Sequence, residues 1–190
     1  KETEYLLMPD TFGLKKKVSI IIPALNEEKL IERLLQQFNE DIKKKFDIEV
    51  IVSDGGSKDS TIQIAKKYAD RIILNIEYFP QNISRGRNEG AKDSRGDVLI
   101  FLNADTFVLD LNYLLEETIK EFTNDEITAI ACPVFVFPDE AKISDKIFHS
   151  FYNNYVMILN KMIMGMGRGE CHIVRRDKFF QAGGYRESLA

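Results

Sequence analysis

The sequence lacks an excess of basic residues: its 190 residues hold 26 Lys and Arg against 30 Asp and Glu, for a net charge of −4. Such a chain has no overall positive field that would hold a polyanion, so we expect no nucleic-acid partner. It also lacks compositional extremes, with 44% apolar, 11% aromatic and 29% charged residues. These values are typical of a folded globular chain and exclude the disordered, collagen-like and coiled-coil classes.

Long apolar runs are absent from this sequence as well, and we expect no leader segment. The longest apolar-leaning stretch, residues 147–164, is interrupted by polar side chains: His149, Asn153, Asn154, Asn160 and Lys161. A bilayer span needs about 20 mostly apolar residues, so this stretch is not a membrane helix. Residues 1–17 lack the apolar core of a signal peptide. We therefore expect a cytoplasmic protein.

Cysteine and histidine are scarce, with two residues of each. Cys132 and Cys171 lie far apart in the chain and outside any C-x-x-C pattern, so we expect free, reduced thiols. His149 and His172 have no partners at the spacing of a zinc site. Two phosphate-binding signatures, G-x-x-x-x-G-K-[ST] and a G-x-G-x-x-G after the first strand, are also missing. Their absence disfavours P-loop nucleotidases and dinucleotide-dependent oxidoreductases.

The sequence does contain a regular alternation of buried strands and helices. Strands rich in Val, Ile and Leu are predicted at residues 18–23, 48–52, 71–75 and 97–102, with helices at 27–46, from about 60, and within 84–94. This order predicts an α/β fold of three layers, Rossmann-like, with a mostly parallel central sheet. In such sheets ligands bind beyond the carboxyl ends of the strands.

The second half of the chain follows a different pattern. We expect a helix at 111–122, a strand at 128–137 confined to an edge by Pro133, a long helix at 142–164 and a strand at 169–175. The long helix is rich in Phe, Tyr and Met, and we expect it to pack on the sheet as core. The alternative is an exposed apolar surface that meets a lipid-linked acceptor or the inner face of a membrane. Residues 18–190 are expected to form one domain after an N-terminal extension, residues 1–17.

Acidic residues follow three of the predicted strands: Glu27, Asp54 and Asp105. A carboxylate at this edge can accept hydrogen bonds from a ribose or a base, or it can ligate a hard divalent cation. Alternatively, Glu27 and Asp54 cap helices, with Asp54 also binding the turn amides of the loop after its strand. Three acids together at the functional edge of one sheet favour the ligand-binding interpretation.

The tripeptide Asn103-Ala104-Asp105 lies directly after a buried strand. Asp105 is expected to hold Mg²⁺ or Mn²⁺, while the small Ala104 lets a ligand approach. Arg85 and Arg87 lie at the start of a small-residue helix, where they suit a phosphate or diphosphate. The alternative for them is a solvated basic patch that pairs with Glu89 and Asp93. Further along the chain, Glu170 and His172 form either an alternating strand face or a polar pocket wall.

Four motifs resemble a known family when they are taken in this order and spacing: VSIIIPALNEE, IVSDGGSKDST, GRNEGAKDSRGDVLIFLNADT and GECHIVRRDKFFQAGGY. Together they look like the nucleotide-sugar-dependent glycosyltransferases of family 2, which have the GT-A fold. The resemblance covers about residues 18–188. It implies inverting transfer of a sugar from a UDP- or GDP-linked donor to a glycan or a polyprenyl- or other lipid-linked acceptor.

The resemblance also implies roles for individual residues. Glu27 and Asp54 would hold the ribose and base, with backbone contacts from Pro23 and Ala24, while Asn103-Ala104-Asp105 matches the D-x-D motif that holds the metal and ribose. Because these donor residues come from the first half of the chain, we expect the second half to bind the acceptor, with Glu170 and His172 on the acceptor side.

This chain departs from the family pattern at two points. Asn103 replaces the first acid of D-x-D, and the segment after the Gly-Gly-Tyr turn, where the family places its general base, is not reached before Ala190. We therefore expect the native chain to continue and to carry its base there. Two other hypotheses remain: a nucleotide-sugar-binding module without turnover, and a nucleotidyltransferase, which would need a basic phosphate loop where ALNEE stands.

Overall fold

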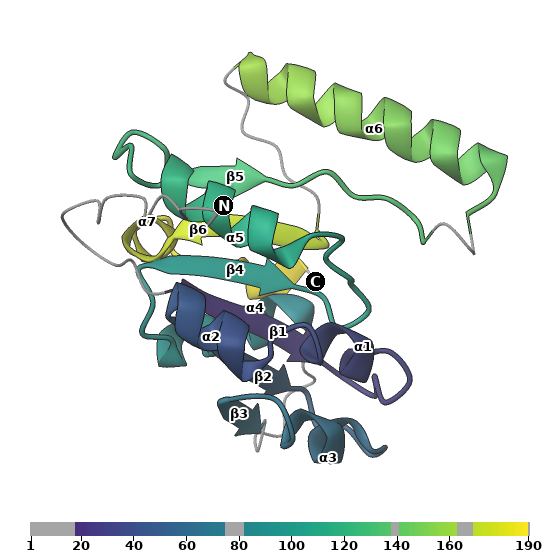
Figure 1. The fold of residues 1–190 in the computed structure, drawn as a ribbon, viewed down its shortest axis with the longest axis vertical. Coiled ribbons are helices and arrows are strands. Elements are labelled where there is room, and N and C mark those ends of the chain that lie inside the picture. Colours follow the sequence, from purple (N-terminus) through teal and green to yellow (C-terminus); the bar gives the residue numbers. More distant parts are fainter. Residues whose placement is uncertain (1–17, 75–81, 138–140, 163–168, 190) are drawn as a thin grey trace, which may run out of the picture.

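The computed structural model describes residues 18–74, 82–137, 141–162 and 169–189 (Figure 1), so the expected N-terminal extension lies outside the described residues. The elements, in chain order, are β1 Val18–Ala24, α1 Ile31–Leu35, α2 Glu40–Phe46, β2 Ile48–Asp54, α3 Thr61–Ala65, β3 Arg71–Leu74, α4 Ile83–Asp93, β4 Val98–Leu102, α5 Leu111–Glu121, β5 Ala129–Ala131, α6 Ile143–Lys161, β6 Cys171–Arg175, α7 Arg176–Gln181 and a 3-10 turn Glu187–Leu189.

The sheet has the strand order β3-β2-β1-β4-β6-β5. The pairs β1–β2, β1–β4 and β2–β3 are parallel, whereas β6 runs antiparallel to both β4 and β5. This arrangement confirms the predicted α/β fold with a mostly parallel sheet. The strand order reverses at β1, which pairs with β2 on one side and β4 on the other. A crevice outside the carboxyl ends of β1 and β4 is therefore the expected ligand site.

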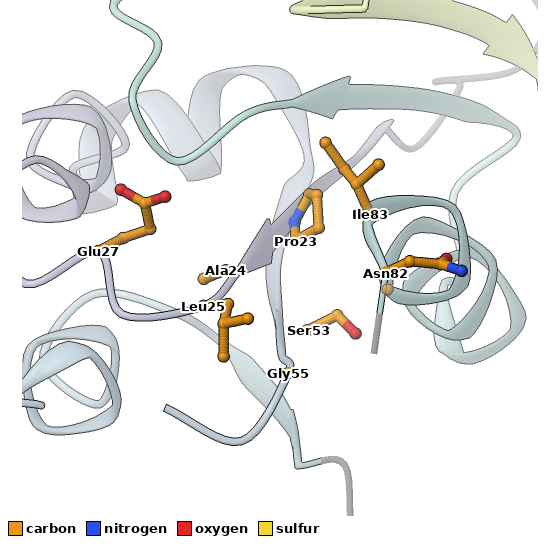
Figure 2. Close-up of a pocket in the computed structure, with 9 residues that line it drawn as sticks. Pro23, Ala24, Leu25, Glu27, Ser53, Gly55, Asn82 and Ile83 are labelled. Atoms are coloured by element: carbon orange, nitrogen blue, oxygen red, sulfur yellow. The ribbon is translucent and has the colours of Figure 1, made fainter. Parts of the chain in front are cut away.

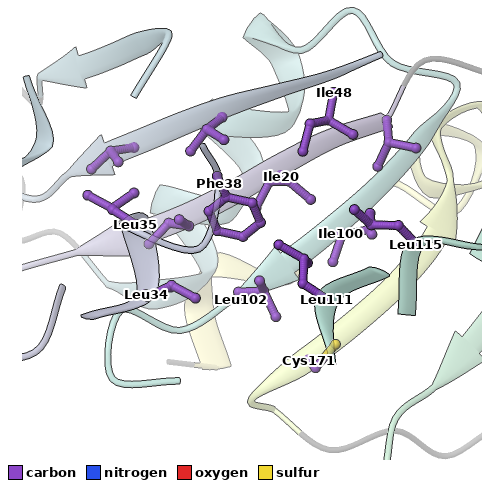
Figure 3. Packing of buried hydrophobic residues seen from close by; sticks show 14 of the residues in the cluster. Ile20, Leu34, Leu35, Phe38, Ile48, Ile100, Leu102, Leu111, Leu115 and Cys171 are labelled. Carbon is purple, nitrogen blue, oxygen red and sulfur yellow. The ribbon is translucent and has the colours of Figure 1, made fainter. Parts of the chain in front are cut away.

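Side chains of the central strands alternate between the two faces of the sheet. Ile20 and Ile22 of β1 join one core cluster together with residues from α1, α2, α3 and α5 (Figure 3), whereas Ile21 joins a second cluster with Ala91 of α4 and Phe179 of α7. The period of two in a strand thus supplies apolar side chains to both helical layers. The result is the expected three-layer architecture.

The prediction of a single helix at residues 27–46 is wrong, because the structure has two short helices there, α1 and α2. Asn39 is the N-cap of α2 and its side chain accepts a hydrogen bond from the backbone N–H of Ile42 at 3.0 Å. Asn favours such caps over helix interiors. Residues 27–30 form a turn before α1, where backbone N–H groups bond to side chains of a neighbouring loop.

The strand expected at 128–137 is also shorter in the structure, since β5 ends at Ala131. Pro133 has no N–H to donate to a sheet ladder. After it, the backbone of Val134 turns to α6 instead: its N–H donates to the Asn153 side chain at 3.2 Å and its carbonyl accepts from the same side chain at 2.9 Å. The position of β5 at the sheet edge agrees with the prediction.

Helix α6 contradicts the expectation that it forms part of the core. Figure 1 shows it as an outlying helix beyond β5, and Val156 is its one buried residue. Several large apolar side chains on α6 are exposed, including Ile143 at 79% and Phe151 at 69%. None of the described helices is both long and apolar enough to cross a bilayer. Peripheral membrane contact stays a prediction.

The two cysteines are free, but they meet across the antiparallel pair β5–β6. Because Ala131 pairs with His172, the next residue, Cys132, faces Cys171, and their Sγ atoms lie 3.2 Å apart. A hydrogen bond from the Cys171 thiol lowers the pKa of Cys132, whereas that contact and burial raise the pKa of Cys171. Their distance along the chain therefore gave no indication of their contact in space.

We expect a diazene oxidant to link Cys132 and Cys171, because the more acidic thiol can attack as thiolate and its partner is already in reach. The two thiols lose two hydrogen atoms, which reduce the diazene to a hydrazine. Intact-mass measurement and peptide mapping check the product, with Cys132→Ser as the control that cannot form it. An unchanged mass in protein whose thiols both react after unfolding would contradict the expectation.

Gly90 marks the closest approach of α4 to the sheet. A Cβ atom at this position would overlap Cγ2 of Ile21, a residue with no exposed surface in β1. We expect Gly90→Val to lower the free energy of unfolding by about 2–3 kcal/mol, the usual cost of overpacking a dense core. Urea unfolding checks this, with Lys92→Val on the exposed side of the same helix as the matched control. Equal losses in both variants would contradict the packing explanation.

Candidate functional site

A pocket of about 240 Å³ opens at the carboxyl ends of β1 and β2 and is called the first pocket below (Figure 2). Three segments supply its walls: the end of β1 and the loop after it, the end of β2, and the start of α4. The lining residues are Pro23, Ala24, Leu25, Glu27, Ser53, Gly55, Asn82, Ile83 and Gly86. The pocket thus lies at the carboxyl edge of the sheet beside β1, on its β2 side rather than between β1 and β4, and it contains three of the residues that the sequence nominates, namely Pro23, Ala24 and Glu27.

Asp54 ends β2 between two pocket-lining residues and is 1% exposed. Its Oδ1 accepts hydrogen bonds from the backbone N–H groups of Gly56 at 2.9 Å and Ser57 at 2.8 Å. The alternative in which Asp54 binds turn amides is therefore correct for this oxygen. Its Oδ2 and the Oγ of Ser53 are buried and have no hydrogen-bond partner among the described residues. Orphaned buried polar atoms are costly, which indicates that a ligand completes them.

The loops after β1 and β2 are bound to each other by hydrogen bonds between backbone and side chains. The N–H of Asn26 donates to Ser57 Oγ at 2.8 Å and the N–H of Glu27 donates to Thr61 Oγ1 at 2.8 Å. In return the Asn26 side chain accepts from the N–H of Lys58 at 2.9 Å. Asn26 has a φ of 55°, a left-handed conformation that Asn tolerates. These contacts hold the pocket wall in place before any ligand arrives.

Glu27 does not cap α1, whose N-cap is Leu30 without a side-chain hydrogen bond. Burial raises the pKa of Glu27, and the nearby carboxylates of Asp105 and Asp59 raise it further. Two of the nominated acids, Glu27 and Asp105, are therefore close enough to repel each other. A cation between or beside them would relieve that repulsion.

The buried Arg87 binds the half-buried Asn103 near this acidic edge. Arg87 is 5% exposed, and its Nη2 donates to Asn103 Oδ1 at 2.8 Å and to the carbonyl of Gly169. The alternative in which Arg87 belongs to a solvated basic patch is therefore wrong, since its guanidinium is buried and donates a hydrogen bond to Asn103. Arg85 is half-buried and its Nε donates to Glu187 Oε2 at 3.1 Å. Ala104 packs into the core, so its side chain faces away from a ligand.

His172 lies in β6 and does not line the first pocket. Its Nδ1 is 2.6 Å from the Oη of Tyr185. Burial, and next the charge of Arg87, lower the pKa of His172 to about 4, and burial raises the pKa of Tyr185 to about 12. At neutral pH the pair is uncharged. Tyr185 is a partner that the sequence analysis missed, although the Gly-Gly turn before it was visible.

Asn82 and Asn88 are two more residues that the sequence analysis did not assign to the site. Asn82 caps α4 by accepting from the N–H of Arg85 at 2.8 Å, and it lines the first pocket. Asn88 bonds to both the N–H and the carbonyl of Tyr185, each at 2.9 Å. An Asn directly before a helical stretch is a recognisable cap signal. The role of Asn88 depends on a contact across almost a hundred residues and had no local signal.

The side-chain oxygens at the acidic edge, after β4, suit a metal ion that is bound jointly by the protein and a ligand. Among the described residues, no group of three or more His, Cys, Asp or Glu could enclose a metal ion. Asp105 offers an exposed carboxylate, while Asn103 Oδ1 already accepts from Arg87. Mg²⁺ and Mn²⁺ favour oxygen ligands, and Mg²⁺ is often held by one or two carboxylates plus substrate phosphates. The residues therefore fit a metal held by Asp105 and a diphosphate.

Sequence comparison decides the family. The model described as "Glycosyl transferase family 2" matches residues 19–181. The chain belongs to this family. Among curated proteins, the uncharacterised glycosyltransferase YfnE of Bacillus subtilis is 34% identical over 122 residues, which cover 63% of this chain and 30% of YfnE. The Staphylococcus aureus poly(ribitol-phosphate) beta-N-acetylglucosaminyltransferase TarS is 32% identical over 108 residues, covering 55% of this chain and 18% of TarS.

Solved structures share the fold of this family 2 chain. A mannosyltransferase from Pyrobaculum calidifontis, in complex with GDP-Man and Mn²⁺, superposes with a TM-score of 0.67 at 20% identity and covers 90% of this chain. TarS in complex with UDP has a TM-score of 0.63 at 20% identity and covers 91% of this chain. These matches confirm the GT-A architecture. The chain spans 48% and 51% of those two structures, so it corresponds to about half of each.

Proposed function

We propose that this chain transfers a sugar from a UDP- or GDP-linked donor to a hydroxyl of a glycan or lipid-linked acceptor, with inversion at the anomeric carbon and a divalent metal ion. The first pocket carries the proposal, because the buried Asp54 Oδ2 and Ser53 Oγ beside it have no partner among the described residues. The family assignment supports the reaction class. Structural relatives that hold UDP or GDP-Man support the donor class.

The nucleoside is proposed to bind against the ends of β1 and β2. Asp54 Oδ2 is an acceptor for an N–H of the base or a hydroxyl of the ribose, and Pro23 and Ala24 supply the adjoining backbone. The N-terminus of α4, at Asn82 and Ile83, also borders this pocket. Asn82 already accepts from the N–H of Arg85. The other N–H groups of the first turn and the partial positive charge of the helix end suit the diphosphate, with Arg85 two residues beyond Ile83.

Asp105 is proposed to hold the metal ion together with the donor diphosphate. When bound, the ion supplies positive charge that stabilises the departing nucleoside diphosphate. Glu27 lies close enough to Asp105 for its pKa to be raised, and it is proposed to bind the ribose. Arg87 keeps Asn103 in position from below. Inversion also needs a base for the acceptor hydroxyl, and residues that hold nucleoside or metal cannot serve as that base.

A thermal-shift and turnover experiment tests the proposal. Unfolding midpoints are measured with UDP, GDP, UDP-glucose and GDP-mannose, each with Mn²⁺ or with EDTA. A ligand at 100 times its Kd stabilises the folded state by about 2.7 kcal/mol, which raises the midpoint by several degrees. Donor hydrolysis with Mn²⁺ supports the transferase, whereas binding without any turnover supports the nucleotide-sugar-binding module. No shift with any of the four ligands would contradict both.

A further inference from the structure

A second pocket, of about 420 Å³, is lined by Asp105 and lies at the carboxyl end of β4, the strand beside β1. It is built from the end of β4, the start of α5 and the segment after β5. Its lining residues are Leu102, Asp105, Thr106, Phe107, Val108, Leu109, Asp110, Tyr113, Leu114, Cys132, Pro133, Val134, Phe135, Val136, Phe137, Glu170 and Cys171. We propose that this second pocket binds an uncharged acceptor through an apolar aliphatic or aromatic group next to the accepting hydroxyl.

The two pockets meet at the acidic edge. Glu27 follows β1 and lines the first pocket, and Asp105 follows the neighbouring parallel strand β4 and lines the second, so the two pockets lie side by side at the carboxyl edge of the sheet. Glu170 is placed beside them, because its carbonyl accepts from the N–H of Asn103 at 3.2 Å. A donor in the first pocket with its diphosphate at Asp105 would therefore direct its sugar toward the second pocket. This step rests on the proposed function.

The walls of the second pocket favour an apolar group. Phe107, Leu114, Val134 and Val136 are among the side chains around it, with Leu102 and Cys171 buried at its floor. Burying apolar ligand surface against such walls gains roughly 25 cal/mol per Å². The Asn153 side chain bonds to the backbone of Val134, so α6 holds the wall in place.

Charge in the second pocket disfavours an anionic acceptor. The described lining residues include three acids, Asp105, Asp110 and Glu170, and no Lys, Arg or His. The N-terminus of α5 borders the pocket, but the Asp110 carboxylate caps it by accepting from the N–H of Tyr113 at 2.9 Å. Arg33 does not line the pocket, and its guanidinium lies over the rings of Phe137 at 4.0 Å and Phe107 at 5.0 Å. The metal ion proposed at Asp105 is already shared with the donor diphosphate, so a phosphate elsewhere in the pocket would meet the carboxylates of Asp110 and Glu170.

Three sugar derivatives test this inference: p-nitrophenyl β-D-glucoside, methyl β-D-glucoside and p-nitrophenyl β-D-glucoside 6-phosphate. Methyl β-D-glucoside differs from the first compound only in lacking the aryl group, and the 6-phosphate differs from it only in its charged phosphate. Binding is measured by ligand-observed NMR to the full chain in saturating UDP and Mn²⁺. We expect the neutral aryl glucoside to bind at least about tenfold more tightly than the other two, since burial of one ring exceeds 1.4 kcal/mol.

A pair of exposed positions supplies matched variants. Leu109, 74% exposed, lines the second pocket, and Ile143, 79% exposed, lies on α6 and does not line it. Leu109→Lys is expected to reduce the preference for the neutral aryl glucoside over its phosphate ester at least about threefold by adding a cation, and Ile143→Lys is expected to leave it unchanged. Val136→Lys, on the wall, should give the larger effect and retain UDP binding.

The outcomes separate this inference from the proposed function. If UDP fails to bind, the proposed function is contradicted and the inference falls with it. If UDP binds but the aryl glucoside does not, or the phosphate ester binds as tightly, the second pocket is not a neutral apolar acceptor site. Equal changes in Leu109→Lys and Ile143→Lys would also overturn the inference, because they would place the aryl group on a non-specific surface.

Discussion

Asp105→Ala is expected to remove the Mn²⁺ dependence of UDP binding and to lower metal-dependent donor turnover at least about 100-fold, because a metal ion contributes several kcal/mol of charge stabilisation to a departing diphosphate. Asp105 is exposed at the acidic edge, so the substitution leaves the core intact. The measurement is calorimetric binding of UDP with Mn²⁺ and with EDTA, followed by donor hydrolysis.

Asp97→Asn is the control for Asp105→Ala, since Asp97 is an exposed carboxylate just before β4, at the opposite end of that strand. It should keep both the Mn²⁺ effect and turnover. If Asp105→Ala retained the Mn²⁺ effect on UDP binding, the metal would not rest on Asp105, and the proposed site would have to be redrawn.

Asp54→Asn is expected to lower the affinity for UDP by about 10- to 100-fold, since a hydrogen bond to a charged group contributes about 1.5–3 kcal/mol. Asn can keep the oxygen that accepts from Gly56 and Ser57, so the loop is retained. The orphaned Oδ2, however, becomes an NH₂ group, which donates and cannot accept from the nucleoside. UDP titration measures the loss, and the unfolding midpoint without ligand shows whether the fold is kept.

Two controls sharpen the Asp54 experiment. Asp54→Ala removes both oxygens and should weaken UDP binding at least as much, with an additional loss of stability from the two unpaired turn amides. Asp97→Asn should bind UDP like the wild type. Wild-type affinity in Asp54→Asn would show that its second oxygen does not contact the nucleoside.

Some features of the fold were visible in local sequence. Strands such as β1 and β4 were predicted because runs of Val, Ile and Leu are typical of strands buried on both faces. Glu27, Asp54 and Asp105 could be nominated because parallel strands bring their carboxyl ends to one edge. The break between α1 and α2 depended on the capping bond of Asn39, a weaker local signal that the apolar stripe of residues 30–42 obscured.

Contacts between distant segments were not visible in the sequence. For Arg87 the sequence left a solvated basic patch open beside phosphate binding, because charged side chains are mostly solvated, yet the structure buries it against Asn103 and Gly169. The apolar side chains of α6 were read as core because helices that bear them usually pack. Most of them are exposed in the structure, while Asn153 and His149 of α6 contact the backbone of Val134.

The sequence by itself determined the alternating α/β order, the family and the acids at the strand ends, because each of these depends on short-range pattern and on fixed spacing along the chain. Only the tertiary structure decided which side chains meet. It left one oxygen of Asp54 without a partner in the described part of the chain, placed Cys132 against Cys171 and formed a second pocket with apolar walls and three acids that include Asp105. Both the cysteine contact and the second pocket arise from packing between segments up to 69 residues apart, from Leu102 to Cys171, a distance over which local propensity carries no information.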